Sequence, residues 1–152
     1  MSNKLVDICV NLTDDAFSGK EKNIIKEANK NNVSKMVLVG NDLESSKEVV
    51  NLAERFNFIA TAGYHPHNAK DWNSKSYSEI LSLLKKDKTK AVGECGLDFN
   101  RNFSNPEVQH SVFMDHISLA KDTNLPLFIH ERDAFHQMYS ILKNNIHDCK
   151  NI

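Results

Sequence analysis

Glycine, proline and cysteine are scarce in this chain. It has five glycines and three prolines among 152 residues, which excludes collagen-like and low-complexity disordered proteins. Its three cysteines, Cys9, Cys95 and Cys149, are an odd and widely spaced set. They are too few for a disulfide framework or a cysteine zinc site, so they indicate a reducing compartment. We expect Cys9 and Cys95 to be small buried residues.

An excess of charge of one sign is also missing, because 19 lysines and arginines nearly balance 20 aspartates and glutamates, for a net charge of -1. This balance excludes the broad basic surface of histone-like or base-reading DNA-binding proteins. A local phosphate site stays open, since a bound metal ion can supply the positive charge.

Long apolar runs are absent as well. Stretches such as Met36–Val39 and Leu125–Ile129 are far shorter than the roughly 18–20 residues of a membrane-spanning helix. The first residues, Met1 to Lys4, lead into a mixed stretch with Asp7 and not into the apolar core of a signal peptide. We therefore expect no membrane partner and a cytoplasmic location, with the nucleus as the alternative.

What the chain does have is a regular alternation of short apolar runs and helical periods, at a length that favours one domain over 1–152. The runs are rich in Val, Ile, Leu and Phe, as buried parallel strands are. Helix signals separate them: Asp42 as an N-cap, Pro106 at a first helical position, and Asn124 at a helix end. The predicted strands are Leu5–Val10, Met36–Val39, Phe58–Ala62, Lys90–Val92 and Pro126–Ile129.

Five strand–helix repeats predict an α/β protein with a parallel sheet and right-handed crossovers. Two architectures fit, a five-stranded doubly wound sheet or the first five units of a (β/α)8 barrel. Length alone favours the doubly wound sheet, because eight-fold barrels typically need about 250 residues. The first strand runs into Val10-Asn11-Leu12-Thr13 without a glycine, which argues against a nucleotide-binding version.

Polar side chains gather where the predicted strands end, and in parallel α/β folds ligands bind at the carboxyl ends of the strands. On the first strand, alternation predicts that Asp7, Cys9 and Asn11 share one face. The later candidates, which follow the third, fourth and fifth strands, are His65, His67, Glu94, Asp98, His130 and Arg132.

Carboxylate and imidazole side chains together are ligands that suit Mg²⁺, Mn²⁺ or Zn²⁺. Glu94 lies at the end of an apolar strand, where a carboxylate is either desolvated at a cost or holds a cation. It is the natural bridge between two ions about 3.5–4 Å apart, which would activate water against a phosphodiester. Structural roles are the alternative: Asp98 and Arg101 as a solvated loop pair, Arg132 as a first-turn helix residue. His110, His116, His136 and His147 lie in helical patterns and are expected at core or surface positions.

Four of these segments resemble the TatD family of metal-dependent deoxyribonucleases, within the amidohydrolase-like (β/α)8 barrels. They occur in family order and spacing, and the stretch Gly-Glu-Cys-Gly-Leu-Asp is very specific. The four segments are Asp7–Thr13, Gly63–His67, Gly93–Phe99 and Leu127–Asp133.

The resemblance implies a barrel hydrolase that cuts DNA phosphodiester bonds, as a 3′–5′ exonuclease or an endonuclease. It implies up to two divalent ions, with Mg²⁺ expected and Mn²⁺ or Zn²⁺ as alternatives, and no stable protein partner. By match, Glu94 and His130 are metal ligands and Glu94 is also catalytic. His65 is a catalytic and substrate-binding residue, and the further substrate-binding residues are His67, Asp98 and Arg132.

Two departures from the family pattern change the expectation. Cys9 and Asn11 stand where many relatives carry metal-binding histidines. The chain ends at Ile152, where a sixth strand is expected, so we expect five of eight barrel units, two missing ligands and self-association through open sheet edges. The alternatives are a catalytically incomplete half-barrel that serves as a binding or assembly module, and a metal-dependent hydrolase of a small ester or amide.

Overall fold

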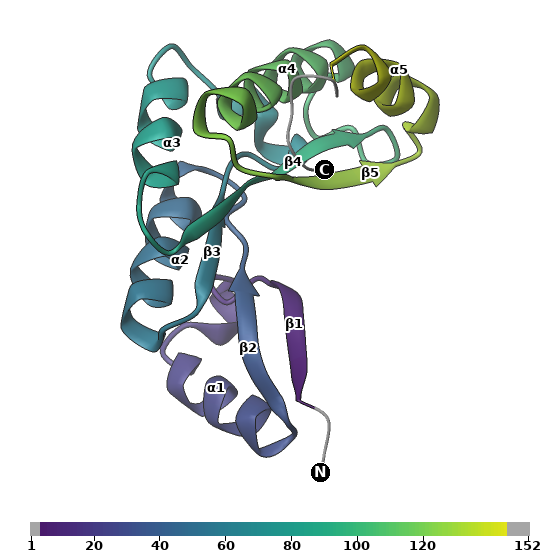
Figure 1. Cartoon of the computed structure of the whole chain (residues 1–152). Helices are drawn as coiled ribbons and strands as arrows, with labels where there is room; N and C mark the ends of the chain where they lie inside the picture. The colour runs from purple at the N-terminus through teal and green to yellow at the C-terminus, as the bar shows by residue number, and fades with distance from the viewer. Residues whose placement is uncertain (1–3, 146–152) are drawn as a thin grey trace.

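Strands and helices alternate along the chain in the predicted order. The computed structural model describes residues 4–145 (Figure 1). The strands are β1 (Leu5–Val10), β2 (Val33–Leu38), β3 (Ile59–Ala62), β4 (Thr89–Asp98) and β5 (Leu127–Arg132). The α-helices are α1 (Glu21–Lys30), α2 (Leu43–Phe56), α3 (Ser76–Leu84), α4 (Pro106–Thr123) and α5 (Phe135–Asn145), and the 3₁₀ helices are η1 (Asp15–Phe17) and η2 (Pro66–Asp71).

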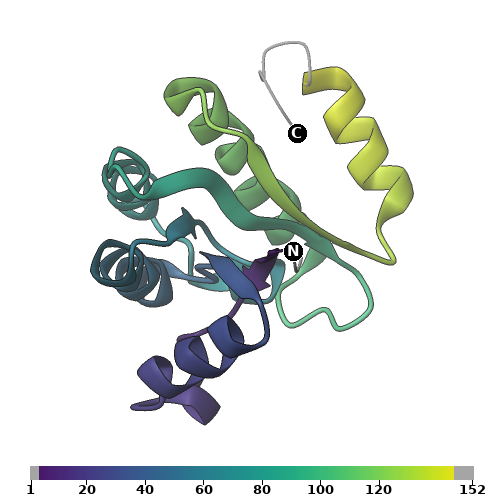
Figure 2. The ribbon, with the colours of Figure 1, turned by 60° about the horizontal axis from the view of Figure 1, so that its bottom comes forward.

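The order of the strands in the sheet decides between the two architectures. The sheet runs β1-β2-β3-β4-β5, and every neighbouring pair is parallel. A doubly wound sheet reverses its strand order at a switch point, and this sheet has no reversal within residues 4–145. The sheet curls with its helices in an arc along the outside (Figure 2). The preference drawn from length is therefore wrong, and the barrel architecture is confirmed as a curled half-barrel.

Strand β4 extends six residues beyond the predicted Lys90–Val92, through the glycines that interrupt the apolar run. Gly93 and Gly96 have φ values of 133° and 138°, which favour glycine. A Cβ atom on Gly96 would lie 2.1 Å from the carbonyl oxygen of His130. Glycine therefore lets β4 pack closely against β5 and continue to Asp98.

The helix signals are confirmed. The side chain of Asp42 accepts a hydrogen bond from Ser45 N at 2.7 Å, and Ser45 Oγ accepts one from Asp42 N at 3.0 Å, which forms a capping box. The side chain of Asn105 caps α4 before Pro106, and Asn124 ends that helix in the left-handed conformation. The ends of α2 and α4 are thus fixed by local chemistry. Between residues 4 and 145, no helix is long and apolar enough to cross a membrane.

The apolar core lies between the sheet and the helices. Leu38, Val49 and Ala60 pack in one cluster of buried residues, and Val92, Leu97 and Phe113 pack in a second. Cys95 belongs to this core, as expected.

Cys9 is exposed, so its predicted burial is wrong. It lies on β1, an edge strand that in the described part of the chain pairs only with β2. Leu5, Val6 and Ile8 on the same strand are 55%, 54% and 61% exposed. Self-association through this edge stays a prediction.

His116 lies in the core, whereas His110 and His136 are exposed; His147 is outside the described residues. The Nδ1 atom of His116 donates to the carbonyl of Val112 at 2.7 Å, and its Nε2 accepts from Tyr64 N at 2.9 Å. Burial lowers the pKa of His116 to about 4, although the hydrogen bond to Val112 opposes the shift. The structure therefore holds this ring neutral.

We expect His116 to make the protein less stable in mild acid. The unfolded chain takes up a proton at His116 below a pH of about 6.5, whereas the folded ring resists protonation down to about 4. The contribution of neutral His116 to the free energy of unfolding is therefore fully present above the unfolded pKa. It is lost as the pH falls, by about 2 kcal/mol at pH 5. Urea unfolding at pH 7.5 and pH 5 should show this difference shrink in His116→Gln. The exposed His110→Gln is the control, and an unchanged pH dependence in His116→Gln would contradict the explanation.

Candidate active site

His65 and His67 are held in the turn that follows β3. His65 is the N-cap of η2, and its Nδ1 atom accepts a hydrogen bond from His67 N at 3.1 Å. The backbone N–H of His65 donates to the carbonyl of Asn41 at 2.9 Å. These bonds tie the end of β3 to the end of β2, with Pro66 stiffening the turn between the two histidines.

Glu94 sits on an irregularity in β4. The pairing of β4 with β5 passes from Val92 opposite Leu127 to Cys95 opposite Ile129, so β4 has one additional residue at this point. Such a bulge redirects a side chain. The freed backbone N–H of Glu94 donates to the carbonyl of Gly40 at 3.0 Å, which anchors the bulge to the end of β2.

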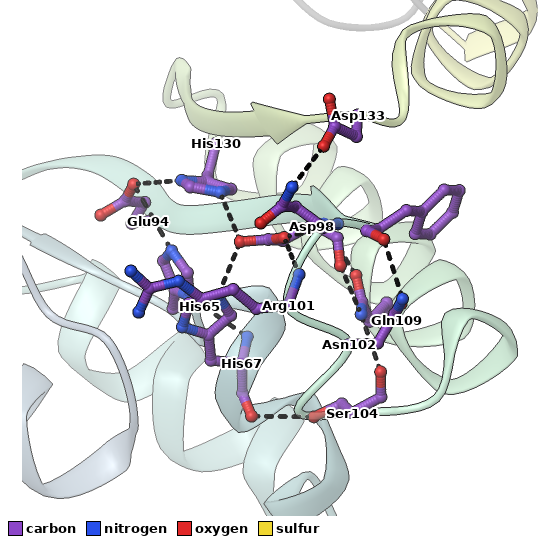
Figure 3. Close-up of polar contacts among 12 residues, drawn as sticks. His65, His67, Glu94, Asp98, Arg101, Asn102, Ser104, Gln109, His130 and Asp133 are labelled. Atoms are coloured by element: carbon purple, nitrogen blue, oxygen red, sulfur yellow. Dashed lines mark hydrogen bonds and ion pairs between the residues drawn. The ribbon is translucent and has the colours of Figure 1, made fainter.

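These elements bring Glu94 together with two histidines (Figure 3). Glu94 Oε1 lies 3.2 Å from His130 Nδ1 and 3.9 Å from His65 Nε2. The three residues each offer a ligand atom, and these atoms lie within 4.8 Å of one another. Their side chains are only 13% to 23% exposed. This spacing and these ligand types suit a divalent cation.

Asp98 lies beside the cluster and contacts two histidines. Its side chain is fully buried, and Oδ2 lies 2.6 Å from His67 Nε2 and 3.3 Å from His130 Nε2. Oδ1 accepts from the backbone N–H groups of Asn100 and Arg101. Burial alone would raise the pKa of Asp98, but the hydrogen bonds from Arg101 N–H, His67 and Asn100 N–H hold it well below its usual range. Asp98 is therefore ionised, and the alternative of a solvated loop pair is wrong.

The pKa values of the two histidines beside Glu94 shift in opposite directions. Burial lowers the pKa of His65 to about 4, with the neighbouring His130 and His67 adding to the effect and Glu94 opposing it. A hydrogen bond to Glu94 raises the pKa of His130 despite its burial. Because Nδ1 of the neutral His65 accepts a hydrogen bond, we assign its proton to Nε2. His65 thus presents an N–H donor to the site. Between Glu94 and His130, a cation can take the place of the proton in their hydrogen bond.

A cavity of about 460 Å³ opens beside this cluster. Cys9 and Asn11 both line it, as the alternation along the first strand predicts. Asp7 is not among the lining residues, and the pairing of β1 with β2 shifts its register between Asp7 and Val10. Partial desolvation of the Cys9 thiol beside the cavity, and the nearby charges of Glu94 and Asp7, raise its pKa. Cys9 therefore stays protonated at neutral pH and is a poor metal ligand.

Arg132 is the one predicted site residue that no described side-chain contact joins to the cluster. Its side chain is exposed at the end of β5, and its carbonyl accepts from Phe99 N at 2.9 Å. Its role in substrate binding stays a prediction.

Sequence reasoning missed the residues that fix the loop between β4 and α4. Gln109 is fully buried; its Oε1 accepts from Asp98 N, and its Nε2 donates to the carbonyls of Asp98 and Ser104. Ser104 in turn donates to the carbonyl of His67 at 2.9 Å. The available signal was the helical spacing of Gln109 with Val112 and His116, which places a polar group on the inward face of α4.

The curled parallel half-barrel, with a carboxylate–imidazole cluster at the carboxyl ends of its strands, defines a (β/α)-barrel protein with its site in the usual place. The family model described as "TatD related DNase" matches residues 6–151. The chain belongs to this family, and the resemblance of its four segments is confirmed.

Relatives and solved structures agree with this assignment. The "3'-5' ssDNA/RNA exonuclease TatD" of Erwinia tasmaniensis is 39% identical over 141 residues, which cover 91% of this chain and 54% of that protein. The Escherichia coli K12 protein of the same name is 36% identical over 140 residues, with the same coverage. This chain thus spans about half the length of the curated relatives it matches.

Two solved structures share the fold. The crystal structure of a TatD homolog from Escherichia coli K12 matches with a TM-score of 0.86 and 27% identity, covering 93% of this chain and 56% of that one. A TatD family hydrolase from Entamoeba histolytica matches with a TM-score of 0.83 and 27% identity, covering 99% of this chain and 57% of that one. Both likenesses span nearly all of this chain.

Proposed function

We propose that this protein is a divalent-metal-dependent hydrolase of phosphodiester bonds in single-stranded DNA, acting from the 3′ end. The observation that carries the proposal is the Glu94–His130–Asp98 arrangement at the carboxyl ends of β4 and β5. Family membership supports nucleic acid over a small ester or amide as the substrate class, and the names of the relatives support the single strand and the polarity.

Glu94 Oε1 and His130 Nδ1 would hold the metal ion. The opposite nitrogen of the same ring, His130 Nε2, lies 3.3 Å from Asp98 Oδ2. A carboxylate–histidine–metal series of this kind fixes the ring tautomer and strengthens the ligand. When bound, the ion would supply positive charge for a phosphate oxygen and lower the pKa of a water molecule. Two protein ligands that leave most of the coordination to water favour Mg²⁺, with Mn²⁺ and Zn²⁺ as alternatives.

His65 would bind the substrate directly. Its ring is neutral at pH 7, and its Nε2–H faces Glu94 from 3.9 Å. This is too long for a hydrogen bond, so the donor is available to a phosphate oxygen beside the carboxylate. His67 donates its Nε2–H to Asp98 at 2.6 Å, so it contributes chiefly by holding Asp98 in place. In this assignment His65 orients the phosphate, and Glu94 would position the metal ion whose positive charge acts on the phosphate.

The test is cleavage by the 152-residue chain of a 5′-labelled single-stranded DNA oligonucleotide. With Mg²⁺ or Mn²⁺ we expect a ladder of labelled products that shorten from the 3′ end. Excess EDTA should stop the reaction, and an excess of the metal should restore it. Intact oligonucleotide in the presence of Mg²⁺, Mn²⁺ and Zn²⁺ would contradict the proposal, as would cleavage that survives chelation.

A further inference from the structure

Phe103 places an exposed aromatic ring at the candidate active site. Its side chain is 56% exposed, and it lines the same cavity as His65 and Glu94. Its ring lies 4.8 Å from the ring of His67, at an interplanar angle of 73°. An apolar surface thus stands next to His67, in the same cavity as His65 and Glu94.

The exposure of Phe103 is built into a restrained loop. On one side, Asn102 adopts the left-handed conformation, and its side chain donates to the carbonyl of Phe99 at 2.8 Å. On the other side, Ser104 is buried and is bonded to His67 O, Lys70 N and the Gln109 side chain. The loop is therefore fixed on both sides of a large apolar residue that it leaves in solvent. A large apolar side chain that lines a cavity beside polar groups is a candidate ligand contact.

The chemistry of the cavity indicates which part of a substrate covers the ring. An aromatic side chain stacks on an open face of a nucleobase, as at a strand end or in a single strand. The cavity is also lined by the amide side chains of Asn11, Asn41 and Asn68. Amide groups of this kind can donate to and accept from the polar edge of a base.

We propose that Phe103 is a stacking platform for the unpaired nucleobase next to the phosphate that His65 and Glu94 are assigned to orient and activate. This inference rests on the proposed function and names the part of the substrate that the site recognises. It assigns the binding of the terminal base to one side chain.

The experiment uses a single-stranded DNA oligonucleotide with 2-aminopurine as its 3′-terminal base and a phosphorothioate at its last linkage. The wild-type chain should quench the 2-aminopurine fluorescence on binding. Phe103→Ala should lose the quenching and bind about 5- to 100-fold more weakly, as expected for one stacked base. Phe103→Trp should keep both properties. Phe135→Ala is the matched control, because Phe135 is 64% exposed but does not line the cavity.

A second oligonucleotide, abasic at its 3′ end, separates stacking from a general structural effect. It should bind equally to the wild type and to Phe103→Ala. Equal quenching by these two proteins, or an equal loss of affinity for both oligonucleotides, would overturn the inference. Cleavage of an unmodified oligonucleotide is measured in parallel. Cleavage without Phe103-dependent quenching overturns the stacking role alone, and quenching without cleavage overturns the proposed hydrolysis alone.

Discussion

Replacing Glu94 with glutamine is expected to lower the affinity for Mn²⁺ by about 100-fold or more and to abolish metal-dependent cleavage. Glu94 supplies the only carboxylate of the group formed with His65 and His130. Glutamine keeps the size of the side chain, but it removes the negative charge that attracts the cation. Without that charge, His130 alone is too weak a site to retain an ion.

Isothermal titration calorimetry with Mn²⁺ measures this effect directly. The matched control is Glu54→Gln, which makes the same chemical change at an exposed position on α2. The control should leave the Mn²⁺ affinity within about twofold, as expected of a substitution away from the site. Equal affinities of Glu94→Gln and the wild type would remove Glu94 from the metal site.

Replacing Asp98 with asparagine is expected to destabilise the protein by about 3 kcal/mol or more. One carboxylate oxygen of Asp98 accepts from two backbone N–H groups, and the other faces the Nε2 atoms of His67 and His130. In one orientation the new NH₂ group points at two backbone N–H donors, and in the other it faces ring nitrogens that now donate and would have to change tautomer. Because the Asp98 side chain is fully buried, water cannot repair the mismatch.

Urea unfolding at pH 7.5 tests this expectation. The control is Asp133→Asn, which alters an exposed carboxylate in a nearby loop that accepts a single hydrogen bond from Asn100 Nδ2. Its free energy of unfolding should stay within about 1 kcal/mol of the wild type. A loss no larger in Asp98→Asn than in the control would show that the buried network does not depend on the charge. The Mn²⁺ affinity of Asp98→Asn should also fall, by about 10- to 100-fold.

Much of the site follows from the sequence because its residues stand at the ends of apolar runs. His65, Glu94 and His130 each come shortly after a predicted apolar strand, and parallel strands bring their carboxyl ends to one edge. The helix caps at Asp42 and Asn105 also follow from the sequence, because each side chain bonds to a backbone N–H two or three residues later. What determines these features lies within a few residues of each position.

The remaining features depend on contacts between distant segments. Length could not choose between the half-barrel and a doubly wound sheet, because only the order of the strands distinguishes them. The predicted burial of Cys9 is wrong because an alternating pattern does not tell whether another part of the protein covers that face of the strand. The support of Asp98 by Gln109 joins a strand end to a helix face eleven residues later. The role of Phe103 depends on a loop whose restraints come from three different elements.

The most direct test of the central claim is pulsed electron paramagnetic resonance of the Mn²⁺-loaded 152-residue chain. The assignment predicts a ¹⁴N coupling from one coordinated imidazole. The coupling should disappear in His130→Gln and persist in His65→Gln, since His65 is assigned as a donor to phosphate and not as a ligand. A spectrum without nitrogen coupling, or a coupling that survives His130→Gln, would contradict the metal site proposed here.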